Sequence, residues 1–358
     1  MKTNLKNFNI KFNEEIPVDK FIEKALYTPK VGYYSSRIPF GKKGDFITAP
    51  TISNLFSEII AIWIVSTWEI FGKPEKFNLV ELGPGDGSLT KVLLETFKKF
   101  PKIKKATNIF LYEKSNFLKN LQKRNIKNDQ VKWIDSFDNI KNGPIIFFGN
   151  EFFDAIPIKQ FLIERNTIKE KYYLVNNLGL NEIYREAKPM DISIIKSFKV
   201  FNKAKFIEYP KLGLSELNKI IEKISKLSGG VLLIDYGKQN LINKNTLQLV
   251  MKNKKIKIDN LIESLGKADI TSLVNFSLLK EYFVKRNLKV EKIVSQKFFL
   301  EKMGIIERAK ILEKKMTAKQ KEYMFTTLKR LLDKNLMGEL FKVIFAFKSN
   351  KQNFLGFK

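Results

Sequence analysis

The residues best suited to chemistry form a glycine-rich turn at 81–87. The turn reads ELGPGDG and places glycines at the alternate positions Gly83, Gly85 and Gly87. A short apolar run precedes it, and apolar residues at helical spacing follow it over 88–97. A strand, a glycine turn and a helix begin a nucleotide-binding α/β unit, in which the backbone of the turn closely approaches the ligand.

The spacing of this turn distinguishes between nucleotide ligands. Dinucleotide-binding turns favour G-x-G-x-x-G, whereas the third glycine here comes one residue earlier and Glu81 stands two residues before the first. The pattern acid-x-G-x-G-x-G is typical of sites for S-adenosylmethionine (SAM). We therefore predict SAM as the cofactor, held by Glu81, Gly83, Gly85 and Gly87. A nicotinamide-dependent oxidoreductase is the rival interpretation.

Polar residues close the next two predicted strands. Glu113 follows the apolar run 109–112, where an acid in this fold accepts hydrogen bonds from both ribose hydroxyls. Asp135 and Ser136 follow the run 131–134, at a corner that often receives the adenine amino group in SAM enzymes. An Asp-Ser pair is also ordinary turn chemistry, so both interpretations remain open for these two residues.

Catalytic candidates follow the fourth predicted strand, 145–148. Asn150, Glu151 and Asp154 flank two phenylalanines there. Because ligands bind outside the carboxyl ends of strands in open α/β sheets, a substrate would meet the cofactor's methyl group at this point. The acids and the amide would orient a cationic or amide nitrogen. Asp154 could instead cap a helix.

A second loop could supply further groups. Residues 44–50 read GDFITAP and lie upstream of the predicted sheet. This loop could fold over the site as a lid and bring Asp45 or Thr48 to the ligand. As a pattern alone, it is only a glycine-containing loop.

Composition excludes several classes of chemistry. The chain has 358 residues, no histidine and no cysteine, so Ser-His-Asp hydrolysis, His-ligated zinc and thiolate metal sites are ruled out. We predict no metal site. The net charge is +28, but the basic residues are mostly lysines scattered from end to end. We interpret this charge as compositional bias rather than a nucleic-acid site.

The apolar pattern also bears on location. Residues 1–12 lack a long apolar segment, and the apolar stretch 59–71 is shorter than the ~20 residues needed to span a bilayer. These observations predict a cytoplasmic protein without membrane insertion. The sequence leaves the oligomeric state open, and a homodimer is possible.

The elements that must position these residues alternate from residue 78 onward. Five apolar runs separated by helical segments predict a parallel sheet with helices on both faces. Two later runs, 289–294 and 341–347, complete a seven-stranded, Rossmann-like sheet whose last strand enters antiparallel. We expect a helical N-terminal extension or lid at 1–75 and a catalytic domain at 76–350. A β-rich insertion at about 158–215 interrupts this domain.

At the level of motifs, the chain resembles the MidA family of SAM-dependent methyltransferases, which includes a mitochondrial complex I assembly factor. The resemblance covers about residues 32–347. Its motifs are GDFITAP (44–50), ELGPGDG (81–87), NEFFDAIP (150–157), DYG (235–237), ADIT (268–271), VNF (274–276) and MGELF (337–341). It implies a class I methyltransferase fold, with the glycine turn holding the methionine part of SAM and Glu113 the ribose. For the mitochondrial member it implies symmetric dimethylation of an arginine on a complex I subunit.

This resemblance implies a protein arginine methyltransferase that acts on a protein partner, with a complex I subunit as the candidate, and aids complex assembly. A guanidinium is a poor nucleophile with a pKa above ~12. Glu151 is expected to hold it and take its proton, with Asp45 or Asp154 as the second acid. The alternatives are a non-catalytic SAM-binding assembly chaperone and an RNA or small-molecule methyltransferase.

Overall fold

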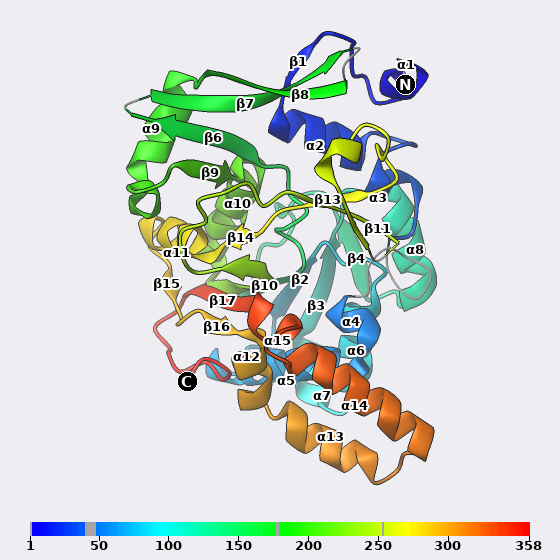
Figure 1. Ribbon diagram of the computed structural model, residues 1–358. Helices are drawn as coiled ribbons and strands as arrows, with labels where there is room; N and C mark the ends of the chain where they lie inside the picture. Colours follow the sequence, from blue (N-terminus) through cyan, green and yellow to red (C-terminus); the bar gives the residue numbers. More distant parts are fainter. Residues whose placement is uncertain (1, 40–47, 166, 177–178, 253) are drawn as a thin grey trace.

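The computed structural model describes residues 2–39, 48–165, 167–176, 179–252 and 254–358. A mixed sheet forms its centre, with the strand order β15-β17-β10-β5-β2-β3-β4 (Figure 1). Its parallel strands are β2 (Phe77–Leu82), β3 (Thr107–Tyr112), β4 (Val131–Ile134), β5 (Ile145–Asn150) and β10 (Gly229–Lys238). The chain order therefore reverses between β2 and β5, which is where ligands bind in such sheets.

The antiparallel edge of this sheet is built late in the chain. β17 (Phe341–Lys348) pairs antiparallel with β10, and β15 (Lys289–Val290) and β16 (Val294–Ser295) both pair with β17. The sequence predicted one strand over 289–294, whereas the structure has two short strands. The antiparallel last strand is confirmed, and seven strands form the continuous order of the sheet. In the described residues β16 and β14 (Val274–Asn275) pair beside this order and bring the sheet to nine strands.

Side chains of the central strands alternate between two hydrophobic cores. Leu79 and Phe148 join one cluster, while Val80 and Phe147 join the other. This alternation follows from the two-residue period of a strand. Since both faces are covered, the strands read as continuous apolar runs.

Helices cover both faces. The first face carries α5 (Asn54–Ile70), α6 (Ser88–Phe97), α7 (Pro101–Ala106), α12 (Gln296–Lys302), α13 (Ile305–Glu313) and α14 (Ala318–Leu332). The second face carries α9 (Pro189–Ser197), α10 (Lys211–Leu227) and α11 (Phe276–Lys285). The remaining helices are α1 (Lys2–Asn7), α2 (Val18–Tyr27), α3 (Tyr33–Ser36), α4 (Ala49–Ile52), α8 (Asn116–Ile126), α15 (Met337–Leu340), η1 (Lys199–Phe201) and η2 (Ile258–Asn260).

A second sheet contains the predicted insertion. β6 (Lys159–Glu164) and β7 (Thr167–Asn176) pair antiparallel, which confirms the strands expected there. β8 (Gly179–Glu186) and β9 (Phe206–Tyr209) extend the sheet on either side of this pair. The N-terminal strand β1 (Glu15–Pro17) also joins it through β7. The domain boundary expected at residue 75 stays a prediction, although β1 before this boundary pairs with β7 after it.

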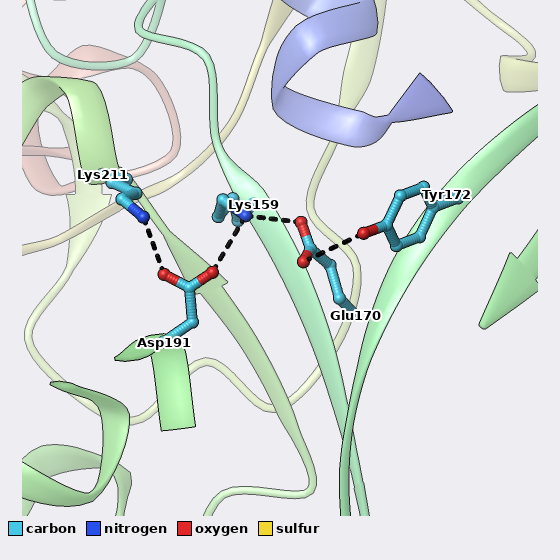
Figure 2. A network of polar contacts seen from close by, with 5 residues as sticks. All are labelled: Lys159, Glu170, Tyr172, Asp191 and Lys211. Carbon is cyan, nitrogen blue, oxygen red and sulfur yellow. Dashed lines mark hydrogen bonds and ion pairs between the residues drawn. The ribbon is translucent and has the colours of Figure 1, made fainter. Parts of the chain in front are cut away.

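A network of ion pairs and hydrogen bonds links the second sheet to α9 and α10, which cover the second face of the central sheet (Figure 2). Lys159 Nζ lies 2.6 Å from Glu170 Oε1 and 3.1 Å from Asp191 Oδ2. Lys211, at the start of α10, donates to the second oxygen of Asp191 at 2.9 Å, and Tyr172 OH donates to Glu170 at 3.4 Å. Burial disfavours ionised Asp191, but the two lysines outweigh it and hold its pKa below the usual range. The network joins β6, β7, α9 and α10.

A third, small sheet was not predicted. It consists of β11 (Gln248–Met251), β12 (Lys254–Ile256) and β13 (Asp269–Thr271), and β14 (Val274–Asn275) pairs separately with β10. Leu249 and Ile270 pack with Phe21 of α2 in a separate hydrophobic cluster. Through this packing, α2 and β13 come to lie near the carboxyl ends of the central strands.

Candidate active site

The glycine turn leaves β2 in a conformation that side chains disfavour. Gly83 and Gly85 both have φ of +59°, in the left-handed region. A Cβ at Gly83 would lie 3.1 Å from Cδ2 of Phe152, so the turn also approaches the fourth-strand segment closely. Gly83 and Gly85 line a cavity, whereas Gly87 lies at the start of α6 and faces Ile126 of α8.

Glu81 lies behind the turn rather than in the cavity. Its side chain is 3% exposed, and one carboxylate oxygen accepts a hydrogen bond from Thr90 Oγ1 of α6. Burial raises the pKa of Glu81 to about 8. The structure therefore places this residue as a link between β2 and α6.

Glu113 borders the cavity at the end of β3. Its Oε1 accepts from Ser115 N at 2.8 Å and its Oε2 from Gln122 Nε2 at 3.2 Å. Burial raises the pKa of Glu113, although these hydrogen bonds counteract the shift. A carboxylate fixed in this way is suited to accept hydrogen bonds from a pair of hydroxyls.

Asp135 and Ser136 lie away from the cavity. The Asp135 side chain is 85% exposed and pairs with Lys119, and Ser136 Oγ lies 3.0 Å from Asp138 Oδ2. Neither residue is among the described cavity-lining residues. This geometry favours the turn interpretation, and the adenine-binding role stays a prediction.

Glu151 has an unusual backbone for a residue with a side chain. It follows β5 with φ of +53°, and its N–H donates to Ile234 O at 2.9 Å. Asn150 Nδ2 donates to its carboxylate at 2.9 Å. Backbone strain of this kind costs about 1–3 kcal/mol and often occurs at functional sites. Here it directs Glu151 into the cavity, which Glu151 lines together with Asp154.

Burial perturbs the acids of this segment. It raises the pKa of Glu151 to about 8, with a further contribution from the negative charge of Asp154. Burial also raises the pKa of Asp154. Asp235 lies behind them, accepts from Phe153 N at 2.7 Å, and has a pKa well above its ordinary value because it is buried next to Asp154. Three carboxylates in so small a volume favour binding a cation or a proton.

The whole cavity is acidic although the protein is strongly basic. Its volume is about 250 Å³. The carboxylates that line it are Glu23, Glu113, Glu151, Asp154, Glu216 and Asp269. Lys114 is the only lysine or arginine among the described lining residues. The cavity should therefore prefer cationic ligands, whatever the charge of the outer surface.

Sequence reasoning missed the wall formed by α2, α3 and β13. Tyr27 and Tyr34 stack with ring centroids 5.6 Å apart. Tyr34 OH donates to Asp269 Oδ2 at 2.7 Å, and Tyr27 OH donates to Ala155 O at 3.2 Å. The ADIT motif at 268–271 was the available signal, but nothing in its spacing placed it beside the glycine turn.

Of the predicted lid residues, Thr48 lines the cavity and Asp45 lies outside the described residues. Thr48 stands at the N-terminus of α4, with its Oγ1 3.2 Å from that of Thr51. Asn150 is not among the described lining residues, but its Oδ1 is buried with no hydrogen-bond partner in the described part of the chain.

The residues present fit SAM. The glycine turn leaves room for close backbone approach, Glu113 can hold paired hydroxyls, and the acidic interior suits a sulfonium and an ammonium group. A water needs about 10–15 Å³ by the same measure of volume, so a cavity of about 250 Å³ admits a much larger ligand.

Comparison with known proteins decides the family. A family model described as "Putative S-adenosyl-L-methionine-dependent methyltransferase" matches residues 59–294. The chain belongs to this family. It is thus a class I methyltransferase, and SAM is its cofactor. The nicotinamide interpretation is set aside.

A solved structure supports the fold. A Burkholderia thailandensis protein crystallised with S-adenosyl-homocysteine superposes on the present chain with a TM-score of 0.80 at 22% identity. The match covers 96% of this chain and 90% of the other.

Curated relatives are similar over most of their length. Proteins named "Protein arginine methyltransferase NDUFAF7, mitochondrial" are 28% identical in Danio rerio and 26% in Homo sapiens. They match 91% and 93% of this chain, and 82% and 80% of the relatives. A homologue so named in Caenorhabditis elegans is 29% identical over 95% of this chain and 86% of its own length.

These names correct the predicted location. The cytoplasmic prediction is wrong, because the relatives that match over most of the chain are named as mitochondrial. The prediction relied on a missing secretory-type apolar segment, whereas mitochondrial transit peptides are amphipathic and give no such signal. Within the described residues, no helix has the length and apolar character needed to cross a bilayer.

Proposed function

We propose that this methyltransferase methylates an arginine side chain of a protein. The supporting observation is the pair of half-buried carboxylates, Glu151 and Asp154, which line the cavity beside the glycine turn. Phe152 lies between these two residues in sequence and contacts the turn at Gly83. The cavity's acidity favours a cationic side chain, and the relatives are named as protein arginine methyltransferases.

The chemistry requires more than binding. SAM, when bound, supplies an electrophilic methyl group. A guanidinium spreads its charge over three nitrogens and is a poor nucleophile. Hydrogen bonds from one edge of the guanidinium to the two carboxylates would draw its charge toward them and leave the other nitrogen richer in electrons.

Glu151 would also accept a proton. Methylation of a guanidinium nitrogen would form one N–C bond, break the methyl–sulfur bond of SAM to leave S-adenosyl-homocysteine, and release one N–H proton. The ionised fraction of a carboxylate with a pKa of about 8, about one-tenth at pH 7, can take this proton and release it to solvent afterwards. No histidine is needed, which is consistent with a chain that has none.

The proposal also extends to which protein carries the methylated arginine. A subunit of respiratory complex I is the first candidate, on the strength of the family resemblance alone, whereas the names of the relatives point only to a protein arginine and to mitochondria. Methylation there would act during assembly of the complex.

The direct test uses labelled SAM and an extract from cells that lack this protein. We expect a labelled protein band that resists RNase, with the label on arginine by mass spectrometry. Label on lysine, RNA or a small molecule would refute the arginine proposal. SAM binding without any transfer would point to the non-catalytic chaperone.

A further inference from the structure

One buried glutamine connects the two parts of the cofactor site. Gln122 lies on α8 and its side chain is fully buried, at 0% exposure. Its Nε2 donates to the carbonyl of Gly85 in the turn at 2.9 Å and to Glu113 Oε2 at 3.2 Å. Its Oε1 accepts from Trp133 Nε1 at 2.9 Å. A single amide therefore contacts the turn, the acid of β3 and a tryptophan of β4.

This arrangement fixes the orientation of the amide. A glutamine amide has two N–H donors and one carbonyl acceptor, and indole N–H can only donate. Rotating the amide by 180° would face its oxygen toward the Gly85 carbonyl and the Glu113 carboxylate, and its NH₂ toward the Trp133 N–H. All three contacts would become repulsive, so only one orientation of the amide satisfies its three partners.

A second amide of α8 holds the adjacent peptide. Asn125 Nδ2 donates to Asp86 O at 2.9 Å. The carbonyls of Gly85 and Asp86 are thus both bound to α8. Because a trans peptide is planar with C=O and N–H on opposite sides, the bond from Gln122 directs the N–H of Asp86 away from α8. The helix therefore sets the peptide orientation of the turn.

We propose that Gln122 is a positioning residue for SAM, holding the glycine turn and the Glu113 carboxylate in the relative arrangement that the cofactor requires. This inference rests on the roles proposed above for the turn and for Glu113. Gln122 does not line the cavity among the described residues, so it acts through these neighbours. Without it, the carboxylate and the turn could each adopt other orientations.

The test measures SAM and S-adenosyl-homocysteine binding by isothermal titration calorimetry. Gln122→Leu should weaken binding at pH 7.5 by at least about tenfold. Asn120→Leu makes a similar change at an exposed position of the same helix and should stay within twofold of the wild type. Trp133→Phe removes only the partner of Oε1 and should have a smaller effect than Gln122→Leu.

Gln122→Glu separates positioning from packing, because it keeps the shape of the side chain. Its ionised form would repel Glu113 and the Gly85 carbonyl, whereas its protonated form can donate to one of them. Its affinity relative to wild type at the same pH should therefore be poor at pH 8 and recover at pH 5.5. A purely structural role predicts no such recovery, and this variant decides the matter if Gln122→Leu fails to fold.

Glu113→Gln separates the proposed role of Gln122 from the assignment of the cofactor site on which it rests. If Glu113→Gln weakens binding while both Gln122 variants bind within twofold of wild type, the role of Gln122 is refuted and the cofactor site stands. If Glu113→Gln also binds normally, the cofactor-site assignment itself is wrong.

Discussion

Replacing Glu151 by glutamine tests the catalytic assignment directly, because the amide keeps the size of the side chain and removes its charge. Glu151 lies in the cavity next to Asp154 and has a pKa of about 8 through burial. The substitution does not require a change in the strained backbone at φ +53°, so we expect the wild type and Glu151→Gln to share it. Differences between them should therefore reflect the carboxylate.

The expected magnitude has two parts. Loss of a charged hydrogen bond to the substrate costs about 1.5–3 kcal/mol, and loss of a general base typically lowers the rate by about 10²–10⁴. We expect kcat to fall by roughly 10²–10⁴ through loss of the base. We expect kcat/KM to fall by a further factor of about 10–150, because the substrate loses its charged hydrogen bond. SAM affinity should change by less than about threefold, since the turn and Glu113 are untouched.

The pH profile adds a second readout. Only ionised Glu151 can take a proton, and a group with a pKa of about 8 is about one-tenth ionised at pH 7. The wild-type kcat/KM should rise about tenfold per pH unit below that pKa. The kcat/KM of the variant should show no such rise. Methyl transfer would be followed with labelled SAM and the identified protein substrate, and binding by calorimetry. Wild-type turnover in Glu151→Gln, or an unchanged pH profile, would refute the assignment.

Three further predictions concern stability and cofactor binding. Gly83→Ala should lower the free energy of unfolding by about 1–2 kcal/mol and weaken SAM binding, since φ is +59° and its Cβ would lie 3.1 Å from Phe152; unchanged urea unfolding and calorimetry would contradict this. The pKa of Glu81 is about 8 in the folded protein and 4.5 in the unfolded chain. Between these pH values only the folded protein keeps the proton, so the contribution of Glu81 to the free energy of unfolding falls as the pH rises. Glu81→Gln should therefore flatten the loss of stability between pH 6 and 8 by on the order of 1 kcal/mol per unit; parallel curves would be inconsistent. Asp191→Asn leaves buried Lys159 with one carboxylate fewer and should cost on the order of 3 kcal/mol in urea unfolding, whereas a loss below about 1 kcal/mol would show that the network contributes little.

Much of the central sheet could be predicted from sequence because its strands are buried on both faces. The apolar runs at 79–82, 109–112 and 131–134 correspond to β2, β3 and β4, and the helix 88–97 matches α6. Local glycine spacing sufficed to predict the turn. These features depend on neighbouring residues and need no knowledge of distant contacts.

The rest of the site depends on contacts distant in sequence. Tyr34 and Asp269 are 235 residues apart and meet through a hydrogen bond, so no local pattern reveals them. Gln122 gives no signal either, because a single glutamine on a helix is usually a solvated residue. The adenine corner at Asp135 was predicted from its place after a strand, but the side chain of Asp135 is 85% exposed and pairs with Lys119 outside the cavity.

The pairing of β1 with β7 has a consequence for synthesis on the ribosome. Glu15 opposes Leu174, a separation of 174 − 15 = 159 residues. At about 5–20 residues per second, the nascent N-terminal strand waits roughly 8–30 s for its partner to be translated. Asp269 is translated later still, so the hydrogen bond from Tyr34 to Asp269 cannot form before that part of the chain has been made. During this interval the apolar side of α2 must be shielded by other contacts or by a chaperone.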